Sequence, residues 1–262
     1  MRLTILGSSG GYPGPENPTS GFLVKDAAKH ATTTLWIDAG TGTFSALQRV
    51  EDFTRIDAVV ISHVHADHCV DLHALNIALR FHKDGVLRKR LYCPLEVWER
   101  MPLLLGDSAE AQEGFRSTFD FQPIEDGGEI EVGGVRVRFV RTDHPNYCLA
   151  MRLESEDGIL TYSADTGPGT DLAGFAQGSD LLLSEATYQE GLEGAPVHLT
   201  ARQAGETARR AGARDLVLTH VWPAYDPQRS VREARETAGE VRVEWAAPGS
   251  SFDVGDMRDM RR

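Results

Sequence analysis

The stretch that decides the fold is Ser62-His63-Val64-His65-Ala66-Asp67-His68, which directly follows the run Ile56-Asp57-Ala58-Val59-Val60-Ile61. A short, apolar, β-branched run of this kind predicts a buried strand. An ordinary turn would use Gly, Pro, Asn or Ser, because these residues supply the turn dihedrals. Three histidines and a carboxylate are instead the ligands of divalent transition metals. The stretch therefore predicts a metal-binding loop, and a surface loop that merely contains histidines is the alternative interpretation.

The spacing within this loop predicts more than one ion. His63 and His65 are two residues apart, so in an extended segment they point to the same side and can share a metal. Asp67 and His68 are adjacent, so the chain must turn to aim both at one place. Two ligand pairs in one short loop favour two neighbouring metals.

Length and charge limit the class of substrate. The chain has 262 residues, of which 41% are apolar, and this is enough for one large domain or two small ones with a real core. Its formal net charge is −12. Because Lys and Arg supply most of the affinity for nucleic acid, this balance counts against a long polyanionic substrate. It does not exclude a small phosphate ester held by metal.

The cysteines and the apolar runs exclude several other classes. Cys69, Cys93 and Cys148 are odd in number and show no CxxC spacing, so neither a disulfide framework nor a cysteine-type zinc site is expected. We interpret them as packing residues. No N-terminal run resembles a signal peptide and no apolar stretch is long enough to span a bilayer, so we expect a cytoplasmic protein without a membrane partner.

The remaining sequence predicts a mixture of strands and helices. Hairpins are expected over residues 119–139 and around Asp157-Gly158, and helices over residues 43–50, 70–80 and 94–106. Thr200 with Gln203 forms a capping box before a helix that Gly212 closes, and Asp226-Pro227 begins the last helix. Residues 83–118 are the least readable part and could cover the site.

Two features near the N-terminus allow two interpretations each. The Gly/Ser/Pro loop over residues 7–15 lacks a GxGxxG pattern; its glycines could let the backbone pass close to a site, or it could be a plain turn. Asp38 ends a predicted strand. It could orient a metal-binding histidine from behind, or it could cap the helix that follows.

Residues of ligand type recur directly after predicted strands. These are His63, His144, Asp165, Glu185 and His220. A single such histidine is usually structural. Several of them are readily gathered at one edge of a sheet, where rigid strands fix their geometry. The pattern therefore predicts one composite site.

As an ordered set, these motifs resemble those of the metallo-β-lactamase fold hydrolases. The resemblance runs from the Gly-rich loop to His220, and it implies one α/β (α+β) domain over residues 1–262, a four-layer αββα sandwich with its site at the sheet edge. Carried over by motif, it implies that one metal is bound by His63, His65 and His144, that the other is bound by Asp67, His68 and His220, and that Asp165 bridges them. The implied cofactors are two divalent ions per chain, zinc first, with manganese or iron as alternatives.

Three further motifs are similar to those of the ribonuclease Z branch. They are Leu6-Gly7-Ser8-Ser9-Gly10, Glu185-Ala186-Thr187 and His198-Leu199-Thr200. In that branch, residues at the places of Glu185 and His198 pair, and the histidine assists phosphodiester cleavage. The alternative is that His198 merely precedes a helix cap.

The chain departs from ribonuclease Z where many members carry an arm that grips tRNA. Residues 145–164 are all that separate His144 from Asp165, and a predicted hairpin uses most of them. The overall pattern is similar to bacterial enzymes of this fold that hydrolyse 3′,5′-cyclic nucleotides. The resemblance thus implies a small phosphodiester substrate, and it suggests a homodimer.

The expected activity is a dinuclear phosphodiesterase that converts cAMP to 5′-AMP. Two divalent ions would activate water and clamp the phosphoryl oxygens. His198, oriented by Glu185, would protonate the leaving oxygen, and Asp67 could also orient the attacking water. Three alternatives stay open: a ribonuclease Z-type tRNA endonuclease, a lactone or β-lactam hydrolase, and a metal-dependent ligand-binding protein without turnover.

Overall fold

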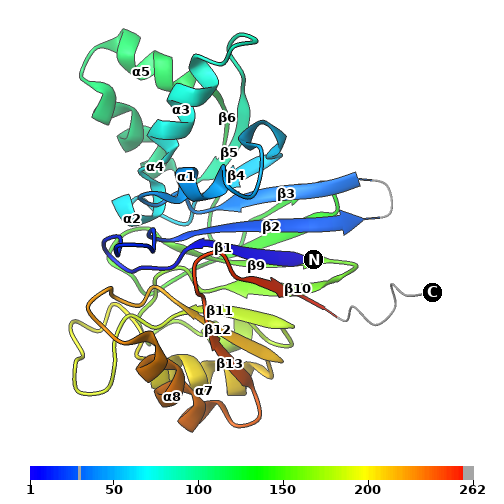
Figure 1. Ribbon diagram of the computed structural model, residues 1–262, viewed down its shortest axis with the longest axis vertical. Coiled ribbons are helices and arrows are strands. Elements are labelled where there is room, and N and C mark those ends of the chain that lie inside the picture. The colour runs from blue at the N-terminus through cyan, green and yellow to red at the C-terminus, as the bar shows by residue number, and fades with distance from the viewer. Residues whose placement is uncertain (29–30, 256–262) are drawn as a thin grey trace.

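Two β-sheets stacked face to face form the centre of the molecule. The computed structural model describes residues 1–28 and 31–255, and over these residues it contains two mixed seven-stranded sheets. Helices cover the outer face of each sheet, at the top and at the bottom of Figure 1. This is the four-layer αββα sandwich that the sequence predicts.

The first sheet has the strand order β14-β1-β2-β3-β4-β5-β6. Its strands are β1 (Arg2–Gly7), β2 (Gly21–Ala28), β3 (Ala31–Ile37), β4 (Ala58–Val60), β5 (Lys89–Cys93), β6 (Phe119–Pro123) and β14 (Ser251–Asp253). Neighbours from β14 to β3 are antiparallel, and neighbours from β3 to β6 are parallel. The parallel half brings the carboxyl ends of β3 and β4 to one edge, where Asp38 and His63 follow.

The second sheet has the order β13-β12-β11-β10-β9-β8-β7. Its strands are β7 (Glu129–Val132), β8 (Val135–Arg141), β9 (Leu149–Ser155), β10 (Gly158–Tyr162), β11 (Leu181–Glu185), β12 (Asp215–Thr219) and β13 (Arg242–Trp245). Strands β10 to β13 are parallel, and β8 runs in the same direction because β9 is antiparallel to both β8 and β10. His144, Asp165, Glu185 and His220 therefore all reach the same edge.

Helices complete the two outer layers. The first sheet carries α1 (Thr43–Leu47), α2 (Ala66–Cys69), α3 (Leu72–Arg80), α4 (Leu95–Arg100) and α5 (Ala109–Arg116), with short 3₁₀ turns at Phe53–Arg55 and Met101–Leu105. The second sheet carries α6 (Leu172–Phe175), α7 (Ala201–Ala211) and α8 (Pro227–Ala238). None of the described helices combines the length and the apolar character needed to cross a membrane.

The core between the sheets is apolar and closely packed. Phe22 and Leu35 of the first sheet face Phe139, Met151 and Leu183 of the second, and each is at most 2% exposed. Removing such side chains from water is the main favourable term in folding. The core fixes the two sheets against each other, so loops from both can build one site.

The structure corrects the hairpin predicted over residues 119–139. Strand β6 pairs with β5 in parallel, with Leu91 opposite Phe121, and only β7 and β8 form a hairpin. The aromatic side chains of β6 explain the difference: Phe119 is buried under the helices of the first sheet, and the Phe121 ring stacks on Trp98 at 4.5 Å between centroids. Burial against distant helices outweighed the local turn signal.

The helix predicted over residues 94–106 is also divided. It forms α4 and then the 3₁₀ turn that contains Pro102, which has no N–H to continue an α-helix. Residues 83–118, the least readable part of the sequence, supply β5, α4 and α5, and their Val97, Met101 and Phe115 pack in the outer core of the first sheet.

Several local predictions are confirmed. The capping box of Thr200 and Gln203 makes both of its hydrogen bonds, Gly212 ends α7 with φ 62°, and Asp226 accepts the Gln228 N–H at the start of α8. The three cysteines are buried and free. The helix predicted over residues 43–50 is shorter, and Gly42, not Asp38, is its N-cap.

Candidate metal centre

Loops from both sheets meet at one edge of the sandwich. This is the edge at which α2 lies, away from the N-terminus (Figure 1). Two groups of metal-binding residue types gather there, each with its ligand atoms close enough to share an ion, and a third set, Asp165, His198 and His220, overlaps both. The first group is His63, His65, His144 and Asp165; the second is Asp67, His68 and His220.

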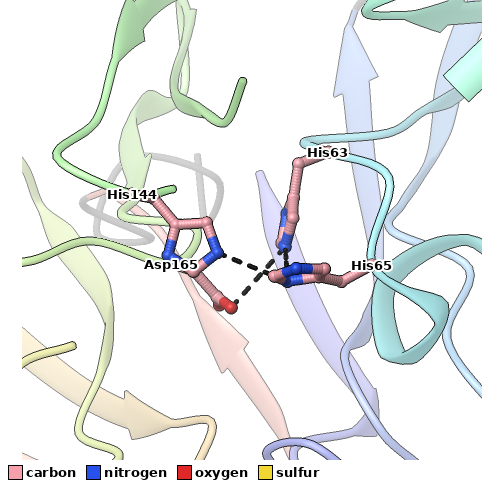
Figure 2. A group of neighbouring side chains, drawn as sticks. All are labelled: His63, His65, His144 and Asp165. Carbon is pink, nitrogen blue, oxygen red and sulfur yellow. Dashed lines mark hydrogen bonds and ion pairs between the residues drawn. The ribbon is translucent and has the colours of Figure 1, made fainter. Parts of the chain in front are cut away.

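The first group surrounds one point with three imidazoles and a carboxylate. The His65 Nδ1 lies 3.0 Å from the His63 Nε2 and 3.3 Å from the His144 Nε2. The Asp165 Oδ2 lies 3.6 Å from the His63 Nε2. Figure 2 shows the four side chains converging from the loop after β4, the loop after β8 and the loop after β10. Separations of this size are those of ligand atoms around a common centre.

The second group lies beside the first and shares Asp165. The Asp67 Oδ2 is 3.2 Å from the His220 Nε2 and 3.6 Å from the His68 Nε2. The other oxygen of Asp165, Oδ1, is 3.2 Å from the His68 Nε2 and 3.5 Å from the His220 Nε2. Asp165 thus turns one oxygen to each group, which is the geometry of a bridging carboxylate.

Two buried atoms fit a bound cation. The His68 Nε2 and the Asp165 Oδ1 are shielded from solvent, lie 3.2 Å from each other and have no other hydrogen-bond partner within the described part of the chain. Buried polar atoms need partners, because leaving one unpaired costs on the order of 1–3 kcal/mol. A divalent ion between them would satisfy both, since imidazole nitrogen and carboxylate oxygen are its usual ligands.

The pKa values of the site agree with this donor set. Burial lowers the pKa of His63, His65 and His144, so these rings are neutral and can coordinate. Burial alone would raise the pKa of Asp165, but the neighbouring His220 and His68 hold it well below the usual range. For His68, the surrounding Asp165, Asp67 and Asp38 outweigh the opposing effect of burial and raise the pKa. The second group therefore attracts positive charge.

Asp38 lies behind His68 and is fully buried. Its Oδ2 is 2.7 Å from the His68 Nδ1, and it also accepts the hydroxyls of Ser62 and Tyr162, both at 2.8 Å. Its Oδ1 accepts the Ser62 N–H at 2.7 Å. A carboxylate in this position fixes the tautomer and direction of a ligating imidazole. Of the two interpretations of Asp38, the structure supports the orienting one.

Other ligands also have outer partners. The His63 Nδ1 lies 3.0 Å from the Ser62 hydroxyl, the His144 Nδ1 3.3 Å from the Val197 carbonyl, and the His220 Nδ1 2.8 Å from the Thr187 hydroxyl. The Asp67 Oδ2 accepts the Gly11 N–H at 2.8 Å, so the Gly-rich loop does pass close to the site. A second contact thus fixes the direction of His63, His144, His220 and Asp67.

His198 lies over both groups and is paired with Glu185. The His198 Nδ1 is 3.0 Å from the Glu185 Oε1, and its ring centroid is 5.4 Å from that of His144 and 5.3 Å from that of His220. Burial opposes its charge, but the bond to Glu185 raises the pKa of His198 to about 9. The contact with Glu185 therefore favours the protonated ring, which can donate a proton.

The buried Glu185 is held in place by several donors. Its Oε1 accepts the Thr166 N–H at 2.6 Å, and its Oε2 accepts the Thr187 hydroxyl at 2.7 Å and the Leu199 N–H at 3.2 Å. Thr187 also contacts His220, so one hydroxyl links the His198–Glu185 pair to the second ligand group.

Backbone strain is concentrated at this site. In the described ranges, the non-glycine residues with positive φ are Asp38, Ala164 and His220, at 53°, 49° and 56°. Two of them are site residues and the third precedes Asp165. Such conformations cost about 1–3 kcal/mol each and persist where the surroundings impose them. At Gly40, a Cβ would lie 2.0 Å from the Asp67 carbonyl oxygen, so no side chain fits behind that ligand.

The structure brings together every residue that the sequence proposed for the site. The seven proposed metal ligands form the two groups, and His198 and Glu185 form the adjoining pair. Sequence reasoning did not identify Ser62, Thr187 and Tyr162 as partners. Ser62 and Thr187 lie in motifs that we quoted, so their position was a usable signal, whereas Tyr162 is an ordinary apolar-strand residue and gave none.

Comparison with known proteins shows the family. Residues 33–221 match the family model described as the beta-lactamase superfamily domain. An uncharacterized Mycobacterium leprae protein, ML1173, is 32% identical over 258 residues, which are 97% of this chain and 89% of that protein. The chain belongs to the metallo-β-lactamase superfamily.

Two further relatives carry descriptions of activity. The probable metallo-hydrolase YhfI of Bacillus subtilis is 28% identical over 253 residues, covering 93% of this chain and 96% of YhfI. A ribonuclease Z of Halorubrum lacusprofundi is 26% identical over 290 residues, covering 90% and 92%. The relation to ribonuclease Z that the motifs indicate is thus confirmed at the level of the superfamily.

Solved structures agree on the fold. The crystal structure of YhfI matches with a TM-score of 0.84 at 25% identity, covering 96% of this chain and 98% of that one. A diphosphatase of the PhnP family matches with a TM-score of 0.75 at 18% identity, covering 96% of each chain. With its His/Asp clusters of the dinuclear type, the chain is a metal-dependent hydrolase of this superfamily.

Proposed function

We propose that this hydrolase is a phosphodiesterase that opens 3′,5′-cyclic nucleotides, converting cAMP to 5′-AMP. The observation that carries the proposal is the His198–Glu185 pair, which lies over both ligand groups. The His198 Nδ1 and the Glu185 Oε1 are 3.0 Å apart. Opening a cyclic phosphodiester leaves an alkoxide on the ribose, and this oxygen needs a proton. A protonated imidazole over the metal-binding centre is a suitable donor.

The roles of the other residues follow from their positions. Two divalent ions held by the groups, zinc first among the candidates, would polarise the phosphoryl oxygens and lower the pKa of water. His63, His65 and His144 would hold one, Asp67, His68 and His220 the other, and Asp165 would bridge. Asp67, fixed by the Gly11 N–H, would also orient the attacking water. Glu185 keeps His198 aimed at the leaving oxygen and charged.

A small substrate is favoured over tRNA. The segment between His144 and Asp165 consists mainly of the β9–β10 hairpin, so it offers no projecting arm. The net charge of −12 also opposes a long polyanion. Ribonuclease Z activity is the second candidate because a ribonuclease Z is among the relatives, and a gel assay with precursor tRNA would reveal it.

The test is to incubate metal-loaded protein with 3′,5′-cAMP and to identify the product by chromatography. We expect 5′-AMP, and we expect a chelator to abolish its formation. If cAMP stays intact while the protein holds its ions, cyclic nucleotides are not the substrate. Lactones and β-lactams, or binding without turnover, would then be examined with the same sample.

His198→Ala tests the proton-donor role. Because general acid catalysis contributes roughly 10²- to 10⁴-fold, kcat should fall by about that factor while both ions are retained. Measuring the metal content of the variant by elemental mass spectrometry separates a loss of proton donation from a loss of the metal ions. His82→Ala is the matched control, since His82 lies beyond α3 and contacts Phe53 instead of the site. Unchanged turnover in His198→Ala would contradict the role.

A further inference from the structure

An apolar groove lies beside the metal centre and takes no part in the chemistry described so far. Its cavity volume is about 160 Å³. Its walls include Pro15 from the Gly-rich loop and Val221, Trp222, Pro223 and Tyr225 from the segment after His220. Trp222 is 38% exposed, so part of its ring is accessible at the groove.

One wall of the groove directly follows a metal-ligand position, and the other is formed by a loop that contacts a ligand. Val221 directly follows His220, and its carbonyl accepts the Gly10 N–H at 3.2 Å. Gly11, the next residue, donates its N–H to Asp67 at 2.8 Å, and a Cβ on Gly11 would lie 3.8 Å from the Trp222 Nε1. The Trp222 indole therefore lies beside Gly11, whose N–H contacts the second ligand group.

The chemistry of the groove suits a flat, uncharged group. None of the described residues that line it carries a charge. Two of its polar side chains are already engaged: Asn17 is held at both ends of its amide by Ser8, and the Ser9 hydroxyl donates to the Asn17 backbone carbonyl. The buried Trp245 Nε1 makes no hydrogen bond within the described residues. What remains is aromatic and proline surface, with the Trp222 and Tyr225 rings stacked at 6.0 Å and 22°.

We propose that this groove binds the nucleobase of the substrate, by stacking against Trp222 and Tyr225, while the phosphate lies at the metals. The proposal rests on the proposed function, because it identifies the second half of the same substrate. An acidic protein gains little from the charge of a nucleotide outside its metal centre, so an apolar contact with the base supplies the missing affinity. Stacking of one base on aromatic side chains is sequence-tolerant, because every base has a π-face.

Two consequences follow for the substrate profile. Because the groove offers aromatic surface and few free hydrogen-bonding groups, cAMP and cGMP should differ in KM by less than about tenfold. A sugar phosphate without a base should bind more weakly than the nucleotide, by the factor that stacking contributes.

The test compares binding of 5′-AMP and of ribose 5-phosphate to the metal-loaded protein by titration calorimetry. The wild type should bind 5′-AMP roughly 5- to 100-fold more tightly than ribose 5-phosphate. Trp222→Ala should remove most of this difference by weakening 5′-AMP alone, and Trp222→Phe should restore part of it. Phe81→Ala, which removes an exposed ring at the end of α3, is the matched control. It should change neither the affinity for 5′-AMP nor the affinity for ribose 5-phosphate.

The same variants distinguish failure of this proposal from failure of the proposed function. With cAMP as substrate, Trp222→Ala should raise KM and leave kcat within about threefold, because stacking is present in ground and transition states alike. If cAMP is hydrolysed and Trp222→Ala changes neither KM nor 5′-AMP binding, the groove is not the base site although the function stands. If cAMP is not hydrolysed but Trp222→Ala still selectively weakens 5′-AMP, the groove proposal survives and the reaction is different.

Discussion

The two ligand groups differ in what stands behind their histidines. In the first group the outer partners are neutral: the Ser62 hydroxyl behind His63 and the Val197 carbonyl behind His144. In the second group a buried carboxylate, Asp38, stands behind His68 at 2.7 Å. The second ion position therefore has more negative charge around it. Because charges interact strongly away from water, we expect the second group to bind a divalent cation more tightly than the first.

The titration behaviour of the histidines shows the same difference. The pKa is lowered for His63, His65 and His144, mainly by burial, and it is raised for His68 by the surrounding carboxylates. The first group offers neutral nitrogens, whereas the carboxylates of the second group favour positive charge at His68. The comparison teaches that a dinuclear site can be built from two unequal halves joined by one residue, Asp165.

The largest effect is expected from Asp165→Asn, because this residue serves both halves. The variant should lose at least about 1000-fold in turnover, since the metal pair supplies both the nucleophile and the charge stabilisation. Metal content should fall from about two ions per chain to one or none. Asp143→Asn, an exposed carboxylate next to His144 that contacts Gly169, is the control. Two ions retained in Asp165→Asn would show that the halves are independent.

Asp38→Asn separates the two halves. In this variant an amide NH₂ group replaces one carboxylate oxygen and cannot accept a hydrogen bond from the groups that now donate to Asp38. His68 would then lose the contact that orients its ring. We expect affinity for the second ion to fall about 10- to 100-fold and affinity for the first to stay nearly constant. Titration of the metal-free protein against a chelating indicator measures the dissociation constants of both ions. If the affinity for both ions fell equally, the difference in charge between the two groups would be refuted.

Tyr162→Phe should produce the smallest effect. The Tyr162 hydroxyl donates to Asp38 at 2.8 Å from the second sheet, and a buried hydrogen bond to a charged group contributes about 1.5–3 kcal/mol. We expect thermal unfolding at lower temperature and a loss of a few-fold in affinity for the second ion. Tyr92→Phe, in the same core, is the control and should leave metal affinity unchanged. If Tyr162→Phe bound the second ion with the wild-type dissociation constant, the contacts with Ser62 alone would be enough to hold Asp38.

The sequence was a good guide wherever the signal was local. The apolar run before His63 and the polar residues at its end are adjacent in the chain, so strand and ligands could be recognised together. The capping box of Thr200 and Gln203 is local in the same way, and its structure matches the prediction. The hairpin pairing of strand β6 was predicted wrongly, because its partner, β5, is chosen by the packing of Phe119 and Phe121 under distant helices.

The sequence by itself determined which residues can bind metal and that they follow strands. Only the tertiary structure decided how those residues are supported. Tyr162 reaches Asp38 across 124 positions of the chain, and Thr187 joins Glu185 to His220 from neighbouring strands. The groove at Trp222 likewise exists only because the Gly-rich loop folds against the segment after β12. The physical reason is the distance along the chain over which each feature is determined. Ligand type and strand ends can be recognised from neighbouring residues, whereas the partners of a buried side chain depend on how the two sheets pack.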